Sequence, residues 1–414
     1  MKKRLAKVVV LVLAAALLLT VPGLVGCGGG TSAESRQIII GILTDFTGPA
    51  SFAVRPTMDG YMDGFKWFQE NDPIPGVEIK FITYDQRTDP GRVPAGYQWL
   101  KGKGATMMYI ISPTDRSLLA DKFTQDQMPC EGSSLDELSP NHPWSFAGWG
   151  SNGMEMETAM QWVMDHWDYS GKGRSPKIGH LSWTSASGKF HQWGADRMLQ
   201  WYPDKFDWKG EEAVPMGTST FAGEVAKLKD CDYIWITPAG TMPAFFVKEA
   251  RARGYTGALL GGSNAFSGYW NLIRDAVAAD QLYESYQIQW WPWWNEDLPL
   301  IDTAREIVLA YHADDTEARL SHSGPFSGLM NAMMAIEALK HAVAAVGAEN
   351  VDGPAIRDGF LAINMTVEGF GNVWRYTEKN HCLVRTMRMF KWDIAAADWK
   401  DTNTGWISPR SLAE

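Results

Sequence analysis

Short apolar runs that alternate with longer amphipathic stretches constrain this chain more than any other feature. Residues Ile38–Leu43 form a continuous apolar run, which is typical of a strand covered on both faces. A turn-rich loop follows at 44–49, and a helical stretch with aromatic residues at helical spacing is expected over about 53–70. The same alternation continues along the chain and predicts an α/β fold with parallel sheets between helices.

The alternation occurs in two successive units. The second unit begins near Asn152. With 414 residues, the chain is long enough to form two sizeable hydrophobic cores without stabilisation by disulfide bonds or metal ions. Asp89-Pro90 is a helix-start signal, although Pro94 lies deep in that expected helix and indicates a shifted start. Strands are expected at about 38–43, 77–84, 106–111, 177–183, 233–237, 258–260, 286–291 and 387–392.

The first 27 residues have the pattern of an export signal. Lys2, Lys3, Arg4 and Lys7 precede an apolar core that is too short to span a bilayer. Leu24-Val25-Gly26-Cys27 then resembles a bacterial lipobox, with Cys27 as the lipidated residue and an ordinary signal as the alternative. Residues 28–35 read as a small, polar tether. No other stretch reaches transmembrane length by this inspection, so the remainder is expected outside the cytoplasm, held to the membrane by a lipid anchor only.

Charge and cysteine spacing exclude several classes of protein. The formal net charge is −10, and it becomes −14 once the four basic residues of segment 1–27 are removed. A chain this acidic is a poor match for nucleic acid or an anionic membrane surface. Cys130, Cys231 and Cys382 are far apart and show no metal-ligand spacing, so isolated buried thiols are favoured, with one disulfide as the alternative.

Recognisable catalytic motifs are absent from the sequence. Gly188-Lys189 lacks the flanking residues of a phosphate loop, and Gly261–Ala265 lacks the final glycine of a nucleophile elbow. The eight histidines are scattered. We therefore predict no catalytic site, no cofactor and no metal, while a hydrolytic site assembled from distant residues stays open as an alternative.

Small hydroxyl residues and glycines gather where the expected strands end. In parallel sheets, ligands bind beyond the carboxyl ends of the strands, where helix N-termini offer free N–H groups. This pattern suits a small polar or carboxylated molecule, and helix capping is the competing interpretation. The segments concerned are Phe46–Pro49, Ser112–Asp115, Gly132–Ser134, Ser185–Gly188, Pro238–Gly240 and Gly262–Asn264.

Three segments carry a family resemblance by their order and spacing after the lipobox. They are Ile40–Pro49 (IGILTDFTGP), Tyr84–Pro90 (YDQRTDP) and Lys248–Tyr255 (KEARARGY). The chain resembles the type I periplasmic solute-binding proteins, the branched-chain amino-acid-binding-like group that feeds ABC importers. The resemblance implies two Rossmann-like lobes joined by a three-segment hinge, a monomer, and ABC permease subunits as partners. Lobe I would hold 36–152 plus 287–364, and lobe II 153–286 plus 365–414.

The same resemblance implies where a ligand would lie. Ser263 stands where the family has an acidic residue that pairs with an amino acid's ammonium. Because a buried ammonium without an opposite charge is costly, an ordinary α-amino acid is disfavoured unless Asp45, Asp115 or Glu284 takes that role. The residues expected to face the ligand are Phe46, Phe52, Ser112, Thr114, Ser133 and Ser134 in lobe I, and Trp183, Ser187, Ala239 and Ser263 in lobe II.

Two further features leave alternatives open. The tryptophan-rich segment Trp290–Trp294 could stack on an aromatic or apolar ligand or on a sugar face, although a place in the core of lobe I together with a partner-facing patch is favoured. Arg116 could pair with a ligand carboxylate, although a surface charge is favoured. The sequence thus favours a solute-binding protein of an ABC importer that captures an amino-acid-like molecule, an amide or an aromatic acid between its lobes. A ligand-binding sensor for a signalling receptor and a secreted hydrolase are the alternatives.

Overall fold

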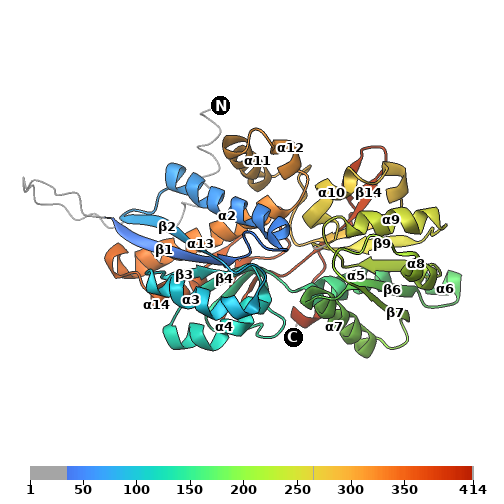
Figure 1. Cartoon of the computed structure of the whole chain (residues 1–414), viewed down its shortest axis with the longest axis horizontal. Helices are drawn as coiled ribbons and strands as arrows, with labels where there is room; N and C mark the ends of the chain where they lie inside the picture. Colours follow the sequence, from blue (N-terminus) through green and yellow to red (C-terminus); the bar gives the residue numbers. More distant parts are fainter. Residues whose placement is uncertain (1–34, 264, 413–414) are drawn as a thin grey trace, which may run out of the picture.

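Two lobes lie side by side along the long axis of the molecule (Figure 1). The structure is a computed structural model, and it describes residues 35–263 and 265–412. The predicted signal peptide, Cys27 and the tether up to residue 34 lie outside the described residues. Each lobe is a largely parallel sheet with helices on both faces, as the alternation of apolar runs predicts.

Lobe I is built on a six-stranded sheet in which all neighbouring strands run parallel, in the order β13-β5-β4-β3-β1-β2. Helices α2, α11, α12, α13 and α14 lie on one side of this sheet, and α3 and α4 on the other (Figure 1). The strands are β1 (Arg36–Thr44), β2 (Val77–Asp85), β3 (Met107–Tyr109), β4 (Cys130–Ser134), β5 (Ser145–Trp149) and β13 (Cys382–Val384). The helices are α2 (Ser51–Asn71), α3 (Val93–Gly102), α4 (Pro113–Asp126), α11 (Pro299–Tyr311), α12 (Thr316–Arg319), α13 (Gly324–Val346) and α14 (Gly353–Ala362).

Lobe II is built on a seven-stranded sheet in the order β15-β14-β10-β9-β8-β6-β7, in which only β14 and β15 make antiparallel pairs. Helices α5 and α7 pack against each other and contact β10 and β6, respectively, while α8 contacts α9 and β6. The strands are β6 (Lys177–Trp183), β7 (Asp207–Val214), β8 (Tyr233–Ile236), β9 (Ala258–Gly261), β10 (Ser285–Gln289), β14 (Arg388–Asp393) and β15 (Asp398–Asp401). The helices are α5 (Asn152–His166), α6 (Tyr169–Lys172), α7 (Ala186–Trp201), α8 (Ala222–Leu228), α9 (Met242–Ala252) and α10 (Trp270–Arg274).

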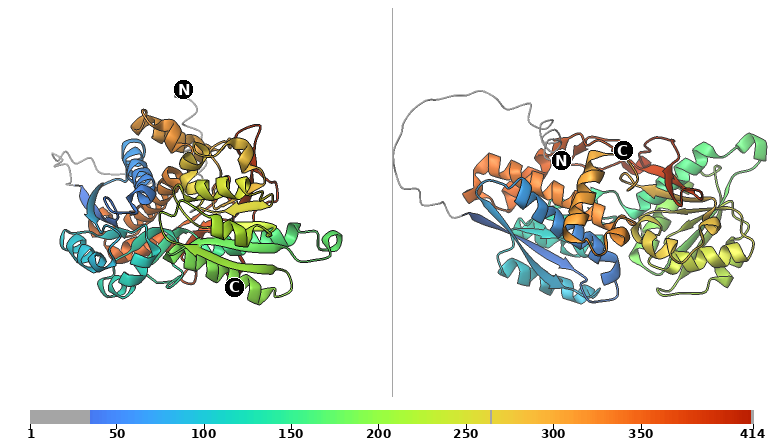
Figure 2. Two further views of the ribbon diagram at one scale, coloured as in Figure 1. Left: turned by 45° about the vertical axis from the view of Figure 1, so that its right-hand side comes forward. Right: turned by 90° about the horizontal axis from the view of Figure 1, so that it is seen from above.

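The described chain crosses between the lobes three times: from β5 to α5, from β10 to α11, and from β13 to β14 (Figure 2). The third crossing differs from the expected boundary at residue 364. Cys382 and Val384 pair with Ala147 and Trp149 of β5, so this late segment completes the sheet of lobe I. A two-stranded hairpin, β11 (Asn364–Met365) with β12 (Trp374–Arg375), precedes it.

Helix α13 is the central helix of lobe I. Contrary to the sequence inspection, it is long and apolar enough to cross a membrane by length and composition alone. However, 56% of its most apolar window is buried, and the helix packs against α2 and α14. These contacts are those of a core helix.

Two predictions about buried groups can be compared with the structure. Cys130, Cys231 and Cys382 are free and buried, which confirms the isolated thiols. Arg116 is not the surface charge that was favoured. Its guanidinium is buried beneath β4, where it donates to the carbonyl oxygens of Phe146, at 3.3 Å, and of Ser134. The lack of a side chain at Gly132 leaves space for this guanidinium, because a β-carbon there would stand 2.5 Å from Arg116 Nε.

Acid is expected to destabilise the fold through His180. Burial lowers the pKa of this imidazole to about 3, and its two nitrogens contact Thr237 Oγ1 at 2.7 Å and Gln192 Oε1 at 3.1 Å. The unfolded chain binds a proton there near pH 6.5 and the folded chain does not, so stability falls as the pH drops from 6.5 towards 3.

His180→Asn should therefore flatten the decline of the melting temperature between pH 7 and pH 4.5. His341→Asn, at an exposed position on α13, is the matched control and should leave that decline as it is in the parent protein. An unchanged decline in the His180→Asn variant would contradict this assignment.

Candidate functional site

The carboxyl ends of the strands in the two sheets face each other where the lobes meet. Phe52, near the start of α2, lies beside Gly240, where a β-carbon would stand 3.1 Å from the phenyl ring. The same ring lies 5.7 Å from the ring of Tyr269, which follows β9 in lobe II. Ser323 at the start of α13 donates its N–H to the Ser267 carbonyl at 2.9 Å. Strand-end loops from both lobes therefore form the interface.

In lobe I, the predicted residues after β1 and β3 lie in turns at helix starts. The Phe46 N–H donates to Asp85 Oδ1 at 2.9 Å, and the ring is half-buried against the core. The Ser112 hydroxyl accepts from the Asp115 N–H at 3.2 Å and so caps α4, which is the role that the competing interpretation gave it. Thr114 is exposed in the first turn of the same helix.

Gly132–Ser134 lies inside β4 and not in the loop after it, so that part of the prediction is wrong. The Ser133 hydroxyl is buried, contacting Tyr109 Oη at 3.3 Å and accepting from Asn331 Nδ2 at 3.0 Å. Ser134 is half-buried and offers its carbonyl to Arg116. Both residues therefore form hydrogen bonds within lobe I.

In lobe II, the predicted residues come from three strand ends. Trp183 closes β6 and is half-buried; its buried indole nitrogen has no hydrogen-bond partner among the described residues. Ser187 lies in the first turn of α7 and accepts at its carbonyl from His191 Nδ1 at 2.9 Å. Ala239 is buried in the loop after β8, next to the glycine that Phe52 contacts.

Ser263, after β9, contacts a carboxylate that the sequence analysis missed. Its hydroxyl donates to Glu155 Oε1 at 2.5 Å, and the Trp290 indole N–H donates to the same oxygen at 2.9 Å. His191 Nε2 stands 3.5 Å from Glu155 Oε2. The Glu155 side chain is only 1% exposed. Glu155 lies in the first turn of α5, directly after the first crossing. Its contacts therefore join α5, α7 and the loop after β9 to the second crossing.

The three acidic residues considered as substitutes for the family's acid are placed differently. Asp45 is used in its own turn, where it accepts from the N–H groups of Gly48 and Ala50 at 2.5 and 2.8 Å. Asp115 is buried, and desolvation raises its pKa to about 6. Glu284 precedes β10 and pairs with Lys391 at 2.5 Å, so it lies at the amino end of β10, whereas Ser263 follows the carboxyl end of the neighbouring parallel strand β9.

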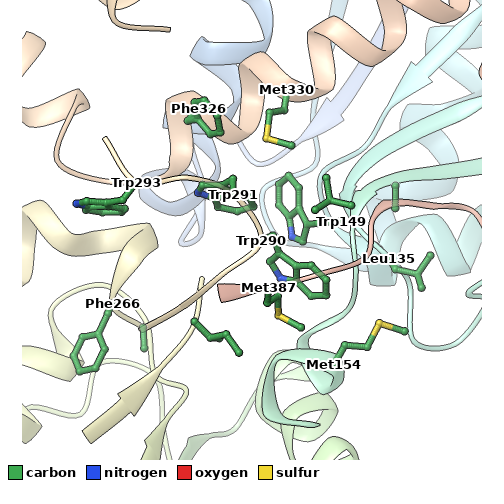
Figure 3. Close-up of a cluster of buried hydrophobic side chains, with 14 of the residues drawn as sticks. Leu135, Trp149, Met154, Phe266, Trp290, Trp291, Trp293, Phe326, Met330 and Met387 are labelled. Atoms are coloured by element: carbon green, nitrogen blue, oxygen red, sulfur yellow. The ribbon is translucent and has the colours of Figure 1, made fainter. Parts of the chain in front are cut away.

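The tryptophans of Trp290–Trp294 are all buried, in and next to the second crossing (Figure 3). The ring of Trp291 packs on that of Trp149 at 4.8 Å, at an interplanar angle of 70°. The Trp294 indole donates to the His322 carbonyl at 2.9 Å. The core role that was favoured agrees with this burial, whereas the partner-facing patch expected with it is wrong, because none of these four tryptophans is exposed. The cluster attaches the second crossing to both lobes.

A cavity of about 360 Å³ also lies between the lobes, at the start of α5. Glu137, Met154, Arg197 and Ser411 are among its lining residues, and of the described candidate residues none lines it. Glu137 of lobe I accepts from the Gly153 N–H at 2.7 Å, so a carboxylate caps α5 across the lobe boundary. Within residues 35–263 and 265–412, no group of three or more His, Cys, Asp or Glu side chains stands ready for a metal ion.

Solved structures share this two-lobed arrangement. A branched-chain amino acid ABC transporter protein of Thermus thermophilus with bound valine aligns with a TM-score of 0.79 at 15% identity, over 90% of this chain and 97% of that one. A fatty acid ABC transporter substrate-binding protein of Thermomonospora curvata gives 0.74 at 18%, over 90% and 92%. A branched-chain amino acid transporter substrate-binding protein of Streptococcus pneumoniae in complex with isoleucine gives 0.67 at 16%, over 90% and 100%.

The comparison at the sequence level agrees with the resemblance seen in the motifs. A search of curated proteins returns no match. The profile of a family described as periplasmic binding protein matches residues 37–400, which is most of the chain. Because this match extends over both lobes, the chain belongs to the periplasmic binding protein family.

Proposed function

We propose that this protein is the solute-binding subunit of an ABC importer and captures a small polar or carboxylated molecule between its lobes. The observation that carries the proposal is the meeting of strand-end loops from both sheets, at Phe52, Gly240 and Tyr269, across an interface spanned by three chain crossings. A molecule held there contacts both lobes at once.

Binding would act on the relative position of the lobes. A ligand that contacts both lobes only in the closed arrangement favours that arrangement by its differential affinity. The residues offered on each side are small: Ser112 and Thr114 at the start of α4, Ser187 at the start of α7, and Ser263 after β9. Such groups form neutral hydrogen bonds that release an unchanged ligand, so we propose binding without catalysis.

The proposed setting follows from the N-terminal sequence. Lipidation at Cys27 and the tether to residue 35 would hold a monomeric binding module on the outer side of the cytoplasmic membrane. There the module would deliver its ligand to the permease subunits.

A ligand panel tests the proposal. The structural neighbours include proteins with bound valine or isoleucine and a fatty acid transporter protein, so the panel contains amino acids and the matching carboxylic acids. A true ligand at about 100 times its Kd should stabilise the purified protein by about 2.7 kcal/mol in thermal unfolding.

Phe52→Ala should weaken that stabilisation, because the ring is 48% exposed and faces lobe II. Leu118→Ala, at a 53% exposed position, is the matched control and should leave it intact. No shift with any member of the panel, or recovery of a chemically altered ligand, would overturn the proposal.

A further inference from the structure

A carboxylate of lobe I binds to two helices of lobe II beside the first crossing. Glu137, in the loop between β4 and β5, accepts from the Gly153 N–H of α5 at 2.7 Å. Its other oxygen, Oε2, lies 3.7 Å from Arg197 of α7. Only 8% of the Glu137 side chain and 29% of the Arg197 side chain are exposed, so salt screens this ion pair less than a pair on the open surface. The pair is therefore a direct electrostatic link between the lobes.

Lobe II holds Arg197 in position for this contact. Its Nε donates to Glu157 Oε1 at 2.5 Å, and the Glu157 side chain is only 1% exposed. The other oxygen of Glu157 accepts from the Ser411 hydroxyl at 2.6 Å, so the C-terminal segment also fixes this carboxylate. The Arg197 guanidinium consequently moves together with lobe II.

The space around the pair allows it to separate. The cavity of about 360 Å³ at the start of α5 has Glu137, Arg197 and Ser411 among its lining residues. Because the lobes are not closely packed at this point, the two charged groups can move apart without displacing side chains of a dense core. The pair can thus form and break as the lobes move.

Both residues lie on the side of the crossings that faces the strand-end loops at the lobe interface. In lobe I, the crossings attach to β13 and β5 at one end of the sheet, and β4, which precedes Glu137, is the next strand towards β2. In lobe II, crossings attach to β14 and β10, and β6, which precedes α7, lies further towards β7. Phe52 and Gly240, which touch across the lobes, follow β1 and β8 on the same side. A rotation about the crossings that separates Phe52 from Gly240 therefore also separates Glu137 from Arg197.

From this arrangement we propose that Glu137 and Arg197 are positioning residues for ligand capture: their ion pair stabilises the arrangement in which the lobes touch, and so raises the affinity for any ligand without contacting it. The inference rests on the proposed function. A contact made in only one of two arrangements shifts their populations by its own free energy. The apparent Kd rises when the binding-competent arrangement becomes less populated. Loss of the pair therefore weakens all ligands by one common factor.

Glu137→Gln tests this role, because the glutamine oxygen can still accept from the Gly153 N–H while the charge opposite Arg197 is lost. Isothermal titration calorimetry compares the variant with the parent protein for valine, isoleucine, 3-methylbutanoic acid and hexadecanoic acid. Burial raises the pKa of Glu137, so the titrations are made at pH 8 to keep its carboxylate ionised. The Kd of each ligand that binds should rise at least threefold, and by the same factor for all of them.

Glu212→Gln is the matched control. Glu212 pairs with Lys227 at 2.6 Å within lobe II, between β7 and α8, so the same change there should leave every Kd as it is in the parent protein. Unchanged affinities in the Glu137→Gln variant, or a loss for one ligand and not for another, contradict the inference and leave the proposed function standing. If the parent protein binds none of the ligands, both fail.

Gly153→Ala gives an independent result if the Glu137 variant does not fold. A β-carbon at Gly153 would stand 2.5 Å from both Glu137 Oε1 and Arg197 Nη2, so the added methyl group pushes the pair apart and retains both charges. This variant should also weaken all ligands by one factor, and small-angle X-ray scattering of the ligand-free protein should show a larger radius of gyration. Kd values and a radius of gyration equal to those of the parent protein would contradict the inference.

Discussion

Gly328→Ala is expected to destabilise the protein by about 3 kcal/mol, at the upper end of the usual cost of adding a methyl group to a packed core. Gly328 lies on α13 where this helix crosses α2. A β-carbon there would overlap the Thr57 carbonyl oxygen and stand 2.6 Å from the Tyr61 nitrogen. Both neighbours are backbone atoms of α2, so they can move only if the two helices separate. Urea unfolding of the variant and the parent protein measures the loss.

Gly223→Ala is the matched control for this experiment. Gly223 is also helical, on α8, but a β-carbon there meets nothing within 4 Å. The same substitution should leave the protein unchanged or stabilise it by roughly 0.4–1 kcal/mol, because it restricts the unfolded chain. Equal midpoints for the Gly328 and Gly223 variants would refute the close helix crossing.

Trp290→Ala is expected to cost about 3–5 kcal/mol, the range for emptying the site of a large buried aromatic side chain. The indole is fully buried in the second crossing, beside Gly150, where a β-carbon would stand 2.3 Å from the ring. Its removal also takes away the N–H that Glu155 accepts at 2.9 Å, which leaves a buried carboxylate with one donor fewer. Chemical denaturation followed by circular dichroism measures the loss.

Two further variants test how much of this loss comes from the apolar volume of Trp290 and how much from its indole N–H. Trp290→Phe retains most of the apolar volume and loses the donor, so it should cost less than the alanine variant. Trp99→Ala removes a tryptophan that is 44% exposed on α3 and should have a much smaller effect. A Trp99 loss as large as the Trp290 loss would show that the second crossing is not a packed core element.

The sequence predicted the parallel, apolar elements well because burial on both faces leaves a clear pattern. Strand β6 occupies Lys177–Trp183 as expected. Pro94 falls in the first turn of α3, because a short 3-10 turn at Pro90–Arg92 precedes that helix. Strand β7, Asp207–Val214, was missed because it is an edge strand with a largely polar sequence. The boundary after β13 was missed because three residues carry too little pattern to assign them to a sheet.

The candidate site was less accessible to sequence reasoning. Hydroxyl residues at strand ends can cap helices or face a ligand. Only the three-dimensional structure shows that Ser133 is buried and Thr114 is exposed. Glu155 was missed because it reaches Ser263 from more than 100 residues away. One signal was present: two acidic residues, Glu155 and Glu157, alternate with methionines in a helix that is apolar on several sides. Such acids are costly to bury unless they have partners.

The late edge strand β13 has a consequence for how the molecule is made. Lobe I receives its last strand only after lobe II has been almost entirely synthesised, since Cys382–Val384 follows every strand of lobe II except β14 and β15. A nascent chain that stops before this segment leaves the β5 edge uncovered. Neither lobe is thus a contiguous stretch that could be excised, exchanged or matured alone, and export must deliver nearly the whole polypeptide before the first half can be completed.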